Sequence, residues 1–241
     1  MRLYYVRHGQ SENNRLWVAE GTNANRVPDP ALTEIGVEQA RHVARHLARC
    51  DDDAMEWDEV AQRWGGFAIT HVYASLMARA AATGHAIAAA TELPLLAWPD
   101  VHELGGIYRR DPESGVYTVE AGAKPAELAV RFPGLVLPED LPEQGWWGRD
   151  HEAWDEFMPR AERVVATLRE RHGGTDDRVV MVSHGGFFAF LMCAILGLPA
   201  ESRPWFSLSN GSVSRIDFDH EGRVWIRYIN RREFLPVALA T

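Results

Sequence analysis

Two short apolar runs in this chain each end on a His-Gly corner, and this repeated pattern constrains the fold more than any other feature. The first run spans residues 2–6 and is followed by Arg7 and His8. The second spans residues 178–182 and is followed, after one serine, by His184. Runs of β-branched and aromatic residues of this length predict buried strands. Helical patterns separate them, so the sequence predicts an α/β fold in which both corners lie at strand ends.

The residue types at these corners suit phosphate chemistry. Ligands of α/β sheets bind beyond the carboxyl ends of the strands, where Arg7 and His8 are expected to lie. A guanidinium holds phosphate oxygens in a fork, and an imidazole can attack phosphorus or transfer protons. Gly9 permits a tight turn or a close backbone approach. A lone strand-end histidine is more often structural, but a second such corner at His184 favours one shared site.

Residues 7–14, with the sequence Arg-His-Gly-Gln-Ser-Glu-Asn-Asn, resemble the R-H-G-[EQ]-[ST]-E-x-N signature of the histidine phosphatase superfamily, the phosphoglycerate-mutase-like proteins. Residues 180–186 are similar to the second signature of that family, V-x-V-S-H-G-G. Residues 75–83 are similar to its S-P-L-x-R-A-x-x-T segment, with Leu76 in place of the proline. The resemblance implies a three-layer αβα sandwich with a mainly parallel, phosphoglycerate-mutase-like sheet.

The resemblance also implies roles for individual residues. His8 would be the nucleophile that becomes phosphohistidine, and His184 the second catalytic-site histidine. A carboxylate just past a predicted strand, followed by two glycines, makes Glu103 the candidate general acid and base. Arg7 and Arg79 would neutralise the transferring phosphoryl oxygens. The residues predicted to bind the substrate are Arg7, Asn14, Gly21, Arg79, His184 and Gly185, of which Gly21 would offer a backbone N–H.

Three functions are compatible with these residues. The favoured one is a metal-independent phosphatase of small phosphomonoesters. A cofactor-dependent phosphoglycerate mutase would use the same catalytic residues, but the family's basic specificity segment has no close match after Glu103, where residues 107–150 are rich in acids, prolines and tryptophans. An inactive scaffold that binds a partner is the third. No H-E-x-x-H motif and no zinc-spaced Cys-His cluster occurs, so neither a metal site nor a cofactor is predicted.

The chain is expected to form a single domain over residues 1–241, with insertions at 51–66 and 107–150, the latter a cap over the active site. The Asn-, Gly- and Pro-rich stretch 15–30 predicts a loop. Apolar and polar residues alternate with period two over residues 209–218 and 223–229, which predicts an antiparallel C-terminal edge hairpin. Such an edge can pair with a second copy of the chain. Helices are predicted over residues 33–47, 76–92, 123–132, 154–172 and 187–196.

Composition restricts the partners. A net charge of −9 and a pI near 5.6 argue against a nucleic-acid-binding face. No apolar run approaches the ~20 residues that span a bilayer, and no basic-then-apolar leader precedes the first strand. The sequence therefore predicts a cytoplasmic protein whose partner is a phosphorylated small molecule. The two cysteines, Cys50 and Cys193, are expected to be reduced thiols.

Overall fold

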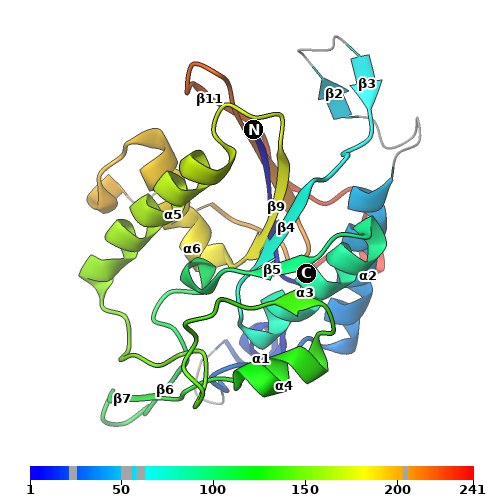
Figure 1. Cartoon of the computed structure of the whole chain (residues 1–241). Coiled ribbons are helices and arrows are strands. Elements are labelled where there is room, and N and C mark those ends of the chain that lie inside the picture. The colour runs from blue at the N-terminus through cyan, green and yellow to red at the C-terminus, as the bar shows by residue number, and fades with distance from the viewer. Residues whose placement is uncertain (22–25, 50–55, 59–62, 203–205) are drawn as a thin grey trace.

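The computed structural model describes residues 1–21, 26–49, 56–58, 63–202 and 206–241. Its centre is a seven-stranded sheet in the order β11-β10-β1-β9-β4-β5-β8 (Figure 1). The first five strands below run parallel to one another, β10 pairs antiparallel with β1, and β11 pairs antiparallel with β10, which confirms the predicted mainly parallel sheet with an antiparallel edge hairpin. The strands are β1 (Arg2–Arg7), β9 (Arg178–Ser183), β4 (His71–Ala74), β5 (Leu95–Ala97), β8 (Leu135–Val136), β10 (Val213–Phe218) and β11 (Val224–Arg231).

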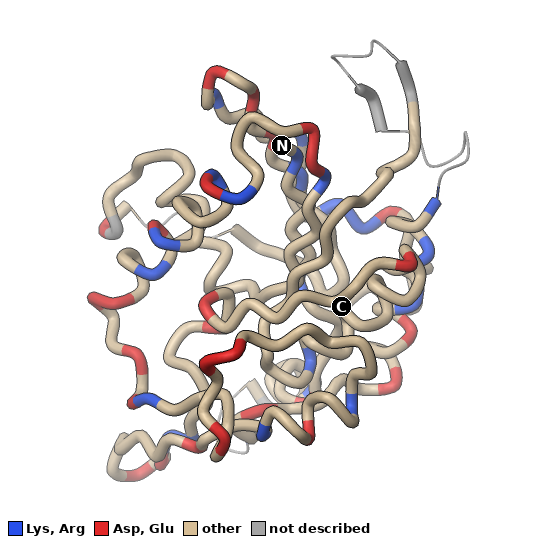
Figure 2. The backbone as a smooth tube through the Cα atoms, viewed as in Figure 1, with Lys and Arg blue, Asp and Glu red and all other residues tan. Residues whose placement is uncertain are grey.

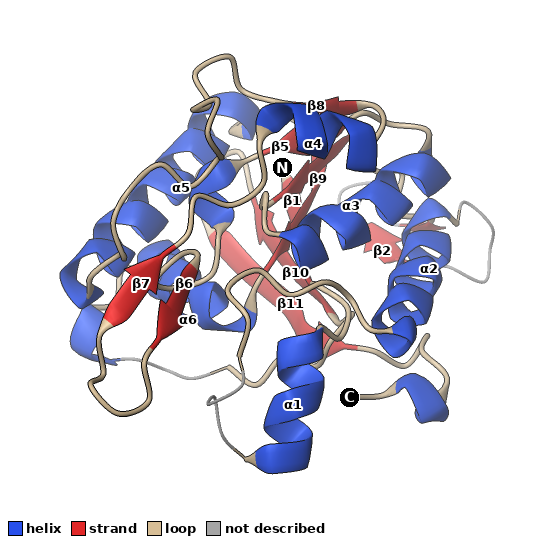
Figure 3. Ribbon diagram, turned by 90° about the horizontal axis from the view of Figure 1, so that it is seen from below, coloured by secondary structure: helices blue, strands red, loops and turns tan. Residues whose placement is uncertain are grey.

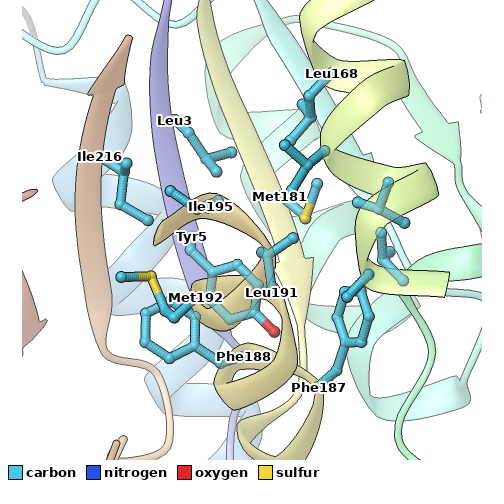
Figure 4. Packing of buried hydrophobic residues seen from close by; sticks show 14 of the residues in the cluster. Leu3, Tyr5, Leu168, Met181, Phe187, Phe188, Leu191, Met192, Ile195 and Ile216 are labelled. Atoms are coloured by element: carbon cyan, nitrogen blue, oxygen red, sulfur yellow. The ribbon is translucent and has the colours of Figure 1, made fainter. Parts of the chain in front are cut away.

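Helices cover both faces of this sheet (Figure 1). One face carries α5 (Phe157–His172) and α6 (Gly185–Leu196), and the other carries α2 (Glu34–Ala48) and α3 (Ala78–Thr91). Because side chains of a strand alternate between faces, β1 serves both cores. Leu3 and Tyr5 pack with α5 and α6, as Figure 4 shows, while Tyr4 and Val6 pack with α2 and α3. The three-layer αβα architecture is confirmed.

The stretch predicted as a loop after the first corner is instead partly helical, because α1 spans Glu12–Glu20. Ser11 caps this helix, and the Asn14 side chain accepts a hydrogen bond from the Ser11 N–H at 3.0 Å, which completes a capping box. Gly21 ends the helix in the left-handed conformation, with φ of 65°. Of the loop-favouring residues in the stretch 15–30, Gly21 therefore supplies the C-terminal cap of a short helix.

Residues 107–150 build a subdomain-like layer near the start of α3. Strands β6 (Tyr108–Arg110) and β7 (Tyr117–Val119) form an antiparallel hairpin, and α4 (Pro125–Arg131) confirms the helix predicted over 123–132. Figure 3, seen from below, shows these elements on the same side of the molecule as α1, towards which β1 points in Figure 1. The layer packs on the start of α3 through one buried cluster, made of Leu76, Met77, Ala81, Ile107, Leu128, Phe132, Trp146 and Trp147. Its role as a cap stays a prediction.

The insertion at 51–66 contributes β2 (Glu56–Asp58) and β3 (Arg63–Gly65), which pair antiparallel. The acidic run 51–53 and Cys50 lie outside the described residues, whereas Cys193 is a buried free thiol.

Charged residues lie mainly on the outer helices and loops (Figure 2). Among the described residues, no helix combines the length and the apolar character needed to cross a membrane. Short 3-10 helices span η2 (Pro99–Val101), η3 (Trp154–Glu156), η4 (Ala200–Ser202) and η5 (Val237–Leu239).

Candidate active site

The sheet order places the two His-Gly corners next to each other. Strands β1 and β9 are parallel neighbours in which Arg7 lies opposite Ser183, so His8 and His184 leave the sheet at the same edge. Their ring centroids are 5.1 Å apart. The adjacent strand β4 ends at Ala74, and the following Ser75 has its Oγ 3.0 Å from Nε2 of His184. Three neighbouring strand ends thus supply one buried polar cluster, as expected for a site at the carboxyl edge of a parallel sheet.

Two glycines from separate motifs allow the His8 corner to pack against the start of α2. A Cβ on Gly9 would lie 2.4 Å from the Gly36 carbonyl oxygen, and a Cβ on Gly36 would lie 2.0 Å from the Gln10 carbonyl oxygen. The Thr33 N–H donates to that same Gln10 oxygen at 2.9 Å, and the Thr33 hydroxyl caps α2. The two backbones are therefore in direct contact, which only glycine permits at these positions.

Hydrogen bonding fixes the tautomer of His8. Its Nδ1 lies 2.7 Å from the Gly9 carbonyl oxygen, which can only accept, so Nδ1 carries the proton. Its Nε2 accepts from the Nε–H of Arg79 at 3.2 Å. Burial lowers the pKa of His8 well below its ordinary value, and the charges of Arg79 and Arg7 lower it further. The imidazole is therefore neutral, with its lone pair on Nε2, as a nucleophile requires.

Arg79 lies in the first turn of α3 and is only 4% exposed. Burial lowers its pKa to about 10, which leaves it charged at neutral pH. Its Nη1 lies 3.7 Å from the carboxylate of Asp29, which also accepts from the Ala78 N–H at 2.9 Å. Asp29 thus caps α3 and partly balances the Arg79 charge. No motif in the sequence indicated Asp29, which lies between two prolines in a loop.

Three buried polar atoms at this cluster have no hydrogen-bond partner among the described residues. They are Nε of Arg7, Nη1 of Arg79 and Nδ1 of His184, and they come from three different segments. Arg7 is otherwise held through Nη1, which donates to the Leu208 carbonyl oxygen. Unpaired buried donors are costly, so groups of them are expected where a ligand supplies the acceptors. An anion with several oxygens, such as a phosphoryl group, meets that requirement.

Glu103 follows η2 and reaches across to the beginning of α6. Its carboxylate accepts hydrogen bonds from the N–H groups of Gly186 at 3.2 Å and Phe187 at 2.9 Å. The Leu104 N–H, at 3.0 Å, is a third donor. A Cβ on Gly186 would lie 2.5 Å from Glu103 Oε1, so the second glycine of the His-Gly-Gly corner makes room for the carboxylate. Helix N-termini favour negative charge in this position.

The carboxylate of Glu103 is also electrostatically close to the arginines. Burial lowers the pKa of Arg7, and the negative charge of Glu103 acts against that effect. The same charge acts on Arg79, after that of Asp29. The structure therefore brings Arg7, His8, Arg79, Glu103 and His184 into one polar cluster, from four separate segments.

Asn14 is tied to the His8 corner through Asn210. Its Oδ1 accepts from the Asn210 amide at 3.1 Å, and the same Asn210 nitrogen lies 3.2 Å from the His8 carbonyl oxygen. Oδ1 of Asn14 also accepts from the Ser11 N–H in the capping box of α1, so this one oxygen connects α1 to Asn210 and the His8 corner. Asn210 was not identified in the sequence, where it forms part of an Asn-Gly turn.

The two glycines that the sequence predicted to bind the substrate, Gly21 and Gly185, differ in their surroundings. The N–H of Gly21 donates to the Trp17 carbonyl oxygen at 2.9 Å, so it is committed to the end of α1 and is not presented to a phosphate. This corrects the expected donor role of Gly21. Gly185, the first residue of α6, lies beside Arg7: a Cβ there would be 3.5 Å from Nε of Arg7.

A supporting threonine was present in a motif but was not identified as part of the site. Oγ1 of Thr83 accepts from the Gly9 N–H at 3.2 Å and donates to the Arg79 carbonyl oxygen at 2.8 Å. It therefore connects the nucleophile corner to the helix that carries Arg79. The signal was the final threonine of the R-A-x-x-T segment, four residues after the arginine.

A possible cation-ligand group lies elsewhere. Among the described residues, His71, His172 and Asp177 bring ligand atoms within 4.8 Å of one another, at the amino ends of β4 and β9 and therefore opposite the corners. Nδ1 of His172 is 2.8 Å from the Asp177 carboxylate, and Nε2 is 3.1 Å from the Tyr73 hydroxyl. Both ring nitrogens of His172 are thus engaged by protein groups, as in a buried polar network that joins α5 to the sheet.

Comparison with known proteins gives consistent matches over most of the chain. The family pattern described as histidine phosphatase superfamily (branch 1) matches residues 3–57 and 55–231. A protein named probable phosphoglycerate mutase GpmB, from Photorhabdus laumondii, is 30% identical over 222 residues, which cover 91% of this chain and 86% of that protein.

Solved structures share the fold at lower identity. Mycobacterial glucosyl-3-phosphoglycerate phosphatase is 23% identical with a TM-score of 0.60, and the match covers 96% of this chain and 99% of that one. Phosphoserine phosphatase from Entamoeba histolytica is 16% identical with a TM-score of 0.59, over 98% and 99% of the two chains.

Proposed function

The chain belongs to the histidine phosphatase superfamily (branch 1), and from that premise we propose that it hydrolyses small phosphomonoesters through a phosphohistidine on His8, without a metal ion. The observation that carries the proposal is the state of His8. This residue is neutral, its proton is held on Nδ1 by the Gly9 carbonyl oxygen, and its Nε2 lone pair lies among buried cationic donors.

In the first step, Nε2 of His8 attacks phosphorus and forms the N–P bond as the ester P–O bond breaks. The electron pair of that bond leaves with the substrate oxygen, which takes a proton from Glu103. This step therefore starts from the protonated form of Glu103 and leaves it as a carboxylate. Arg7 and Arg79 would direct towards the phosphoryl oxygens the N–H groups that make no hydrogen bond to the described residues, and Nδ1 of His184 would add a third donor in the tautomer that protonates this nitrogen. Most of the catalytic effect then comes from positioning and charge, as is general for phosphoryl transfer.

In the second step, water attacks the phosphohistidine. Glu103, now a carboxylate, takes one proton from that water as the new P–O bond forms. The N–P bond breaks, its electron pair returns to Nε2 of His8, and inorganic phosphate leaves. Because Glu103 gives a proton in one step and receives one in the next, a single carboxylate serves both.

A phosphoglycerate mutase is the second candidate, favoured by the 30% identity to the Photorhabdus protein that bears this name. The first step is the same in both functions. They differ in the acceptor, because a mutase returns the phosphoryl group to a retained phosphoglycerate, whereas a phosphatase gives it to water.

The test is a turnover assay of the wild type and His8→Ala, with p-nitrophenyl phosphate and a panel of phosphometabolites in the presence of a chelator. We expect phosphate release that resists the chelator, is lost in His8→Ala and persists in the matched control His220→Ala, whose histidine is exposed on a turn. Acid-labile phosphate trapped on the wild type alone would identify the phosphohistidine.

Other outcomes separate the alternatives. Isomerisation of 3-phosphoglycerate that depends on added bisphosphoglycerate, with no net phosphate release, would identify a mutase. Absence of both activities and of any phosphoenzyme would reject enzymatic function and favour a scaffold.

A further inference from the structure

The described chain contains a fully buried ion pair outside the group of residues that face the phosphoryl site. Arg160, on α5, is 0% exposed, and Glu152 is 6% exposed. Nη2 of Arg160 donates to one oxygen of Glu152 at 2.8 Å, and Nε donates to the other at 2.5 Å. This two-point geometry fits a guanidinium fork to a carboxylate. The desolvation of both charges offsets most of the attraction in such a pair, so it contributes little net stability, whereas removing one partner is strongly destabilising.

The remaining donors of Arg160 hold the loop that carries Glu103. Nη1 donates to the carbonyl oxygens of Asp100 at 2.8 Å and His102 at 3.1 Å. Both residues precede Glu103 in this loop. The loop is therefore attached to a guanidinium whose own orientation is fixed by the Glu152 carboxylate.

Glu152 holds the other side of the same loop. Its side chain accepts from the Gly105 N–H at 3.3 Å, and its backbone N–H donates to the Gly105 carbonyl oxygen at 3.2 Å. Glu103 thus lies between two attachment points made by one ion pair. Gly105 and Gly106, both with positive φ, have no side chain that could anchor this part of the loop.

The guanidinium also contacts the helix that receives the Glu103 carboxylate. The carbon of the Arg160 guanidinium lies 4.5 Å from the ring centroid of Phe187, in a cation–π contact. Phe187 is the residue whose N–H donates to Glu103 at 2.9 Å. Arg160 therefore contacts both the loop that carries Glu103 and the helix that receives its carboxylate.

We propose that the Arg160–Glu152 pair is the positioning device of the general acid, which holds the Glu103 carboxylate at the edge of the site so that it meets the leaving oxygen. This inference rests on the proposed phosphatase function. It assigns Arg160 and Glu152 as positioning residues, and it predicts that variants of the pair lose activity in proportion to how much the leaving group needs a proton. Misplacing an acid slows the departure of a poor leaving group but hardly affects a leaving group that needs no proton.

The test compares two substrates in each variant. One is p-nitrophenyl phosphate, whose leaving group departs as a stable phenolate, and the other is glycerol phosphate, whose alkoxide needs a proton. We expect Arg160→Lys, which keeps the charge but loses the fork, to lower kcat/KM about 10²-fold on glycerol phosphate and less than about threefold on p-nitrophenyl phosphate. The comparison uses kcat/KM because it covers only the steps up to departure of the leaving group, whereas hydrolysis of the phosphohistidine, for which Glu103 is the base, is common to both substrates. Glu103→Gln should show the same selectivity with a larger loss.

Two further variants guard against loss of folding. Glu152→Gln keeps the side-chain shape, and the double variant Arg160→Met/Glu152→Gln removes both charges together, so that neither is left buried alone. The matched control is Arg215→Lys, the same change in another buried two-point pair, with Asp217 on β10, at the amino end of β1. We expect this control to retain the wild-type ratio of the two substrates.

The outcomes are distinct. Equal losses on both substrates, or no loss, in variants that fold would overturn the positioning role while the phosphatase function stands. Loss of selectivity in Glu103→Gln itself would overturn the assignment of the acid, and with it this inference. A wild type that hydrolyses neither substrate would overturn the proposed function instead.

Discussion

The Nε–H of Arg79 donates a hydrogen bond to Nε2 of His8 across 3.2 Å, so a cation occupies the lone pair assigned to attack phosphorus. Attack therefore requires that this hydrogen bond be released. An incoming phosphoryl group offers Arg79 anionic oxygens in exchange, which are stronger acceptors than a neutral imidazole. In this arrangement the substrate itself frees the nucleophile, and the unliganded enzyme keeps it occupied.

Arg79→Lys tests this exchange. Lysine keeps one positive charge but has no fork to hold two phosphoryl oxygens. We expect kcat/KM to fall about 10²-fold, with the protein still folded. Steady-state kinetics with p-nitrophenyl phosphate and a circular dichroism melt check this, with Arg41→Lys on the exposed face of α2 as control. A loss below about threefold would contradict the role of the fork.

Asp29 separates a structural effect from an electrostatic one. Asp29→Asn keeps an oxygen for the Ala78 N–H but removes the charge next to Arg79. We expect inorganic phosphate to inhibit this variant several-fold more tightly, because a repelling carboxylate is gone, with little change in stability. Asp29→Ala should in addition lose about 1 kcal/mol of unfolding free energy with the helix cap. Inhibition constants and denaturant titrations measure both, and weaker phosphate inhibition in Asp29→Asn would refute the electrostatic part.

Gly36→Ala sets helix propensity against close packing. Alanine within a helix is favoured by about 1 kcal/mol over glycine, but here its Cβ would lie 2.0 Å from the Gln10 carbonyl oxygen. Because the obstacle is backbone, we expect a net destabilisation of about 3 kcal/mol and reduced activity through the displaced His8 corner. Urea unfolding measures it. Gly65→Ala, where nothing lies within 4 Å, is the control and should stay within about 0.5 kcal/mol.

His46 gives a pH dependence with a definite sign. Burial, aided by Arg231 and Arg49, lowers its pKa to about 4, and its ring stacks on Phe234 at 4.1 Å. The unfolded chain binds a proton on this residue as pH falls below its ordinary pKa, whereas the folded chain does not until about pH 4. The free energy of unfolding should therefore fall as the pH is lowered from the ordinary histidine pKa to about 4.

His46→Phe should remove that part of the decline. Phenylalanine can keep the stacked ring but cannot be protonated, so we expect it to be more stable than the wild type by about 1 kcal/mol at pH 5, relative to the difference at pH 8. Thermal unfolding at both pH values provides the measurement. An unchanged pH dependence would show that His46 is already protonated when folded. His8, His102 and His184, whose pKa values are lowered for the same reason, should supply a remaining decline in both proteins.

The sequence predicted the parts of the fold that follow from local patterns. The strand at β9 and the helix α5 have apolar periodicities that depend on a few neighbouring residues only, and both lie where expected. The helix α1 was missed because residues such as Ser11 and Gly21 are common both in loops and in helix caps. Which role they take depends on whether the chain between them is helical, and composition alone does not decide that.

The same reasoning explains which contacts at the site were found. His8, Arg79 and His184 stand in recognisable motifs, and the parallel sheet brings these together. Asp29 and the Arg160–Glu152 pair were missed because each depends on contacts between distant segments. Arg160 lies 58 residues from His102, whose carbonyl oxygen it binds, and no local pattern links them.

Strand β1 lies between β9 and β10, and both of these neighbours come from the last third of the chain. During synthesis, a nascent chain that ends before residue 178 already contains His8, Arg79 and Glu103, yet β1 has neither partner strand. Pairings over such long sequence separations form late in folding. The candidate site therefore cannot assemble on a partly made chain, and the proposed phosphoryl transfer would begin only when synthesis of the protein is nearly finished.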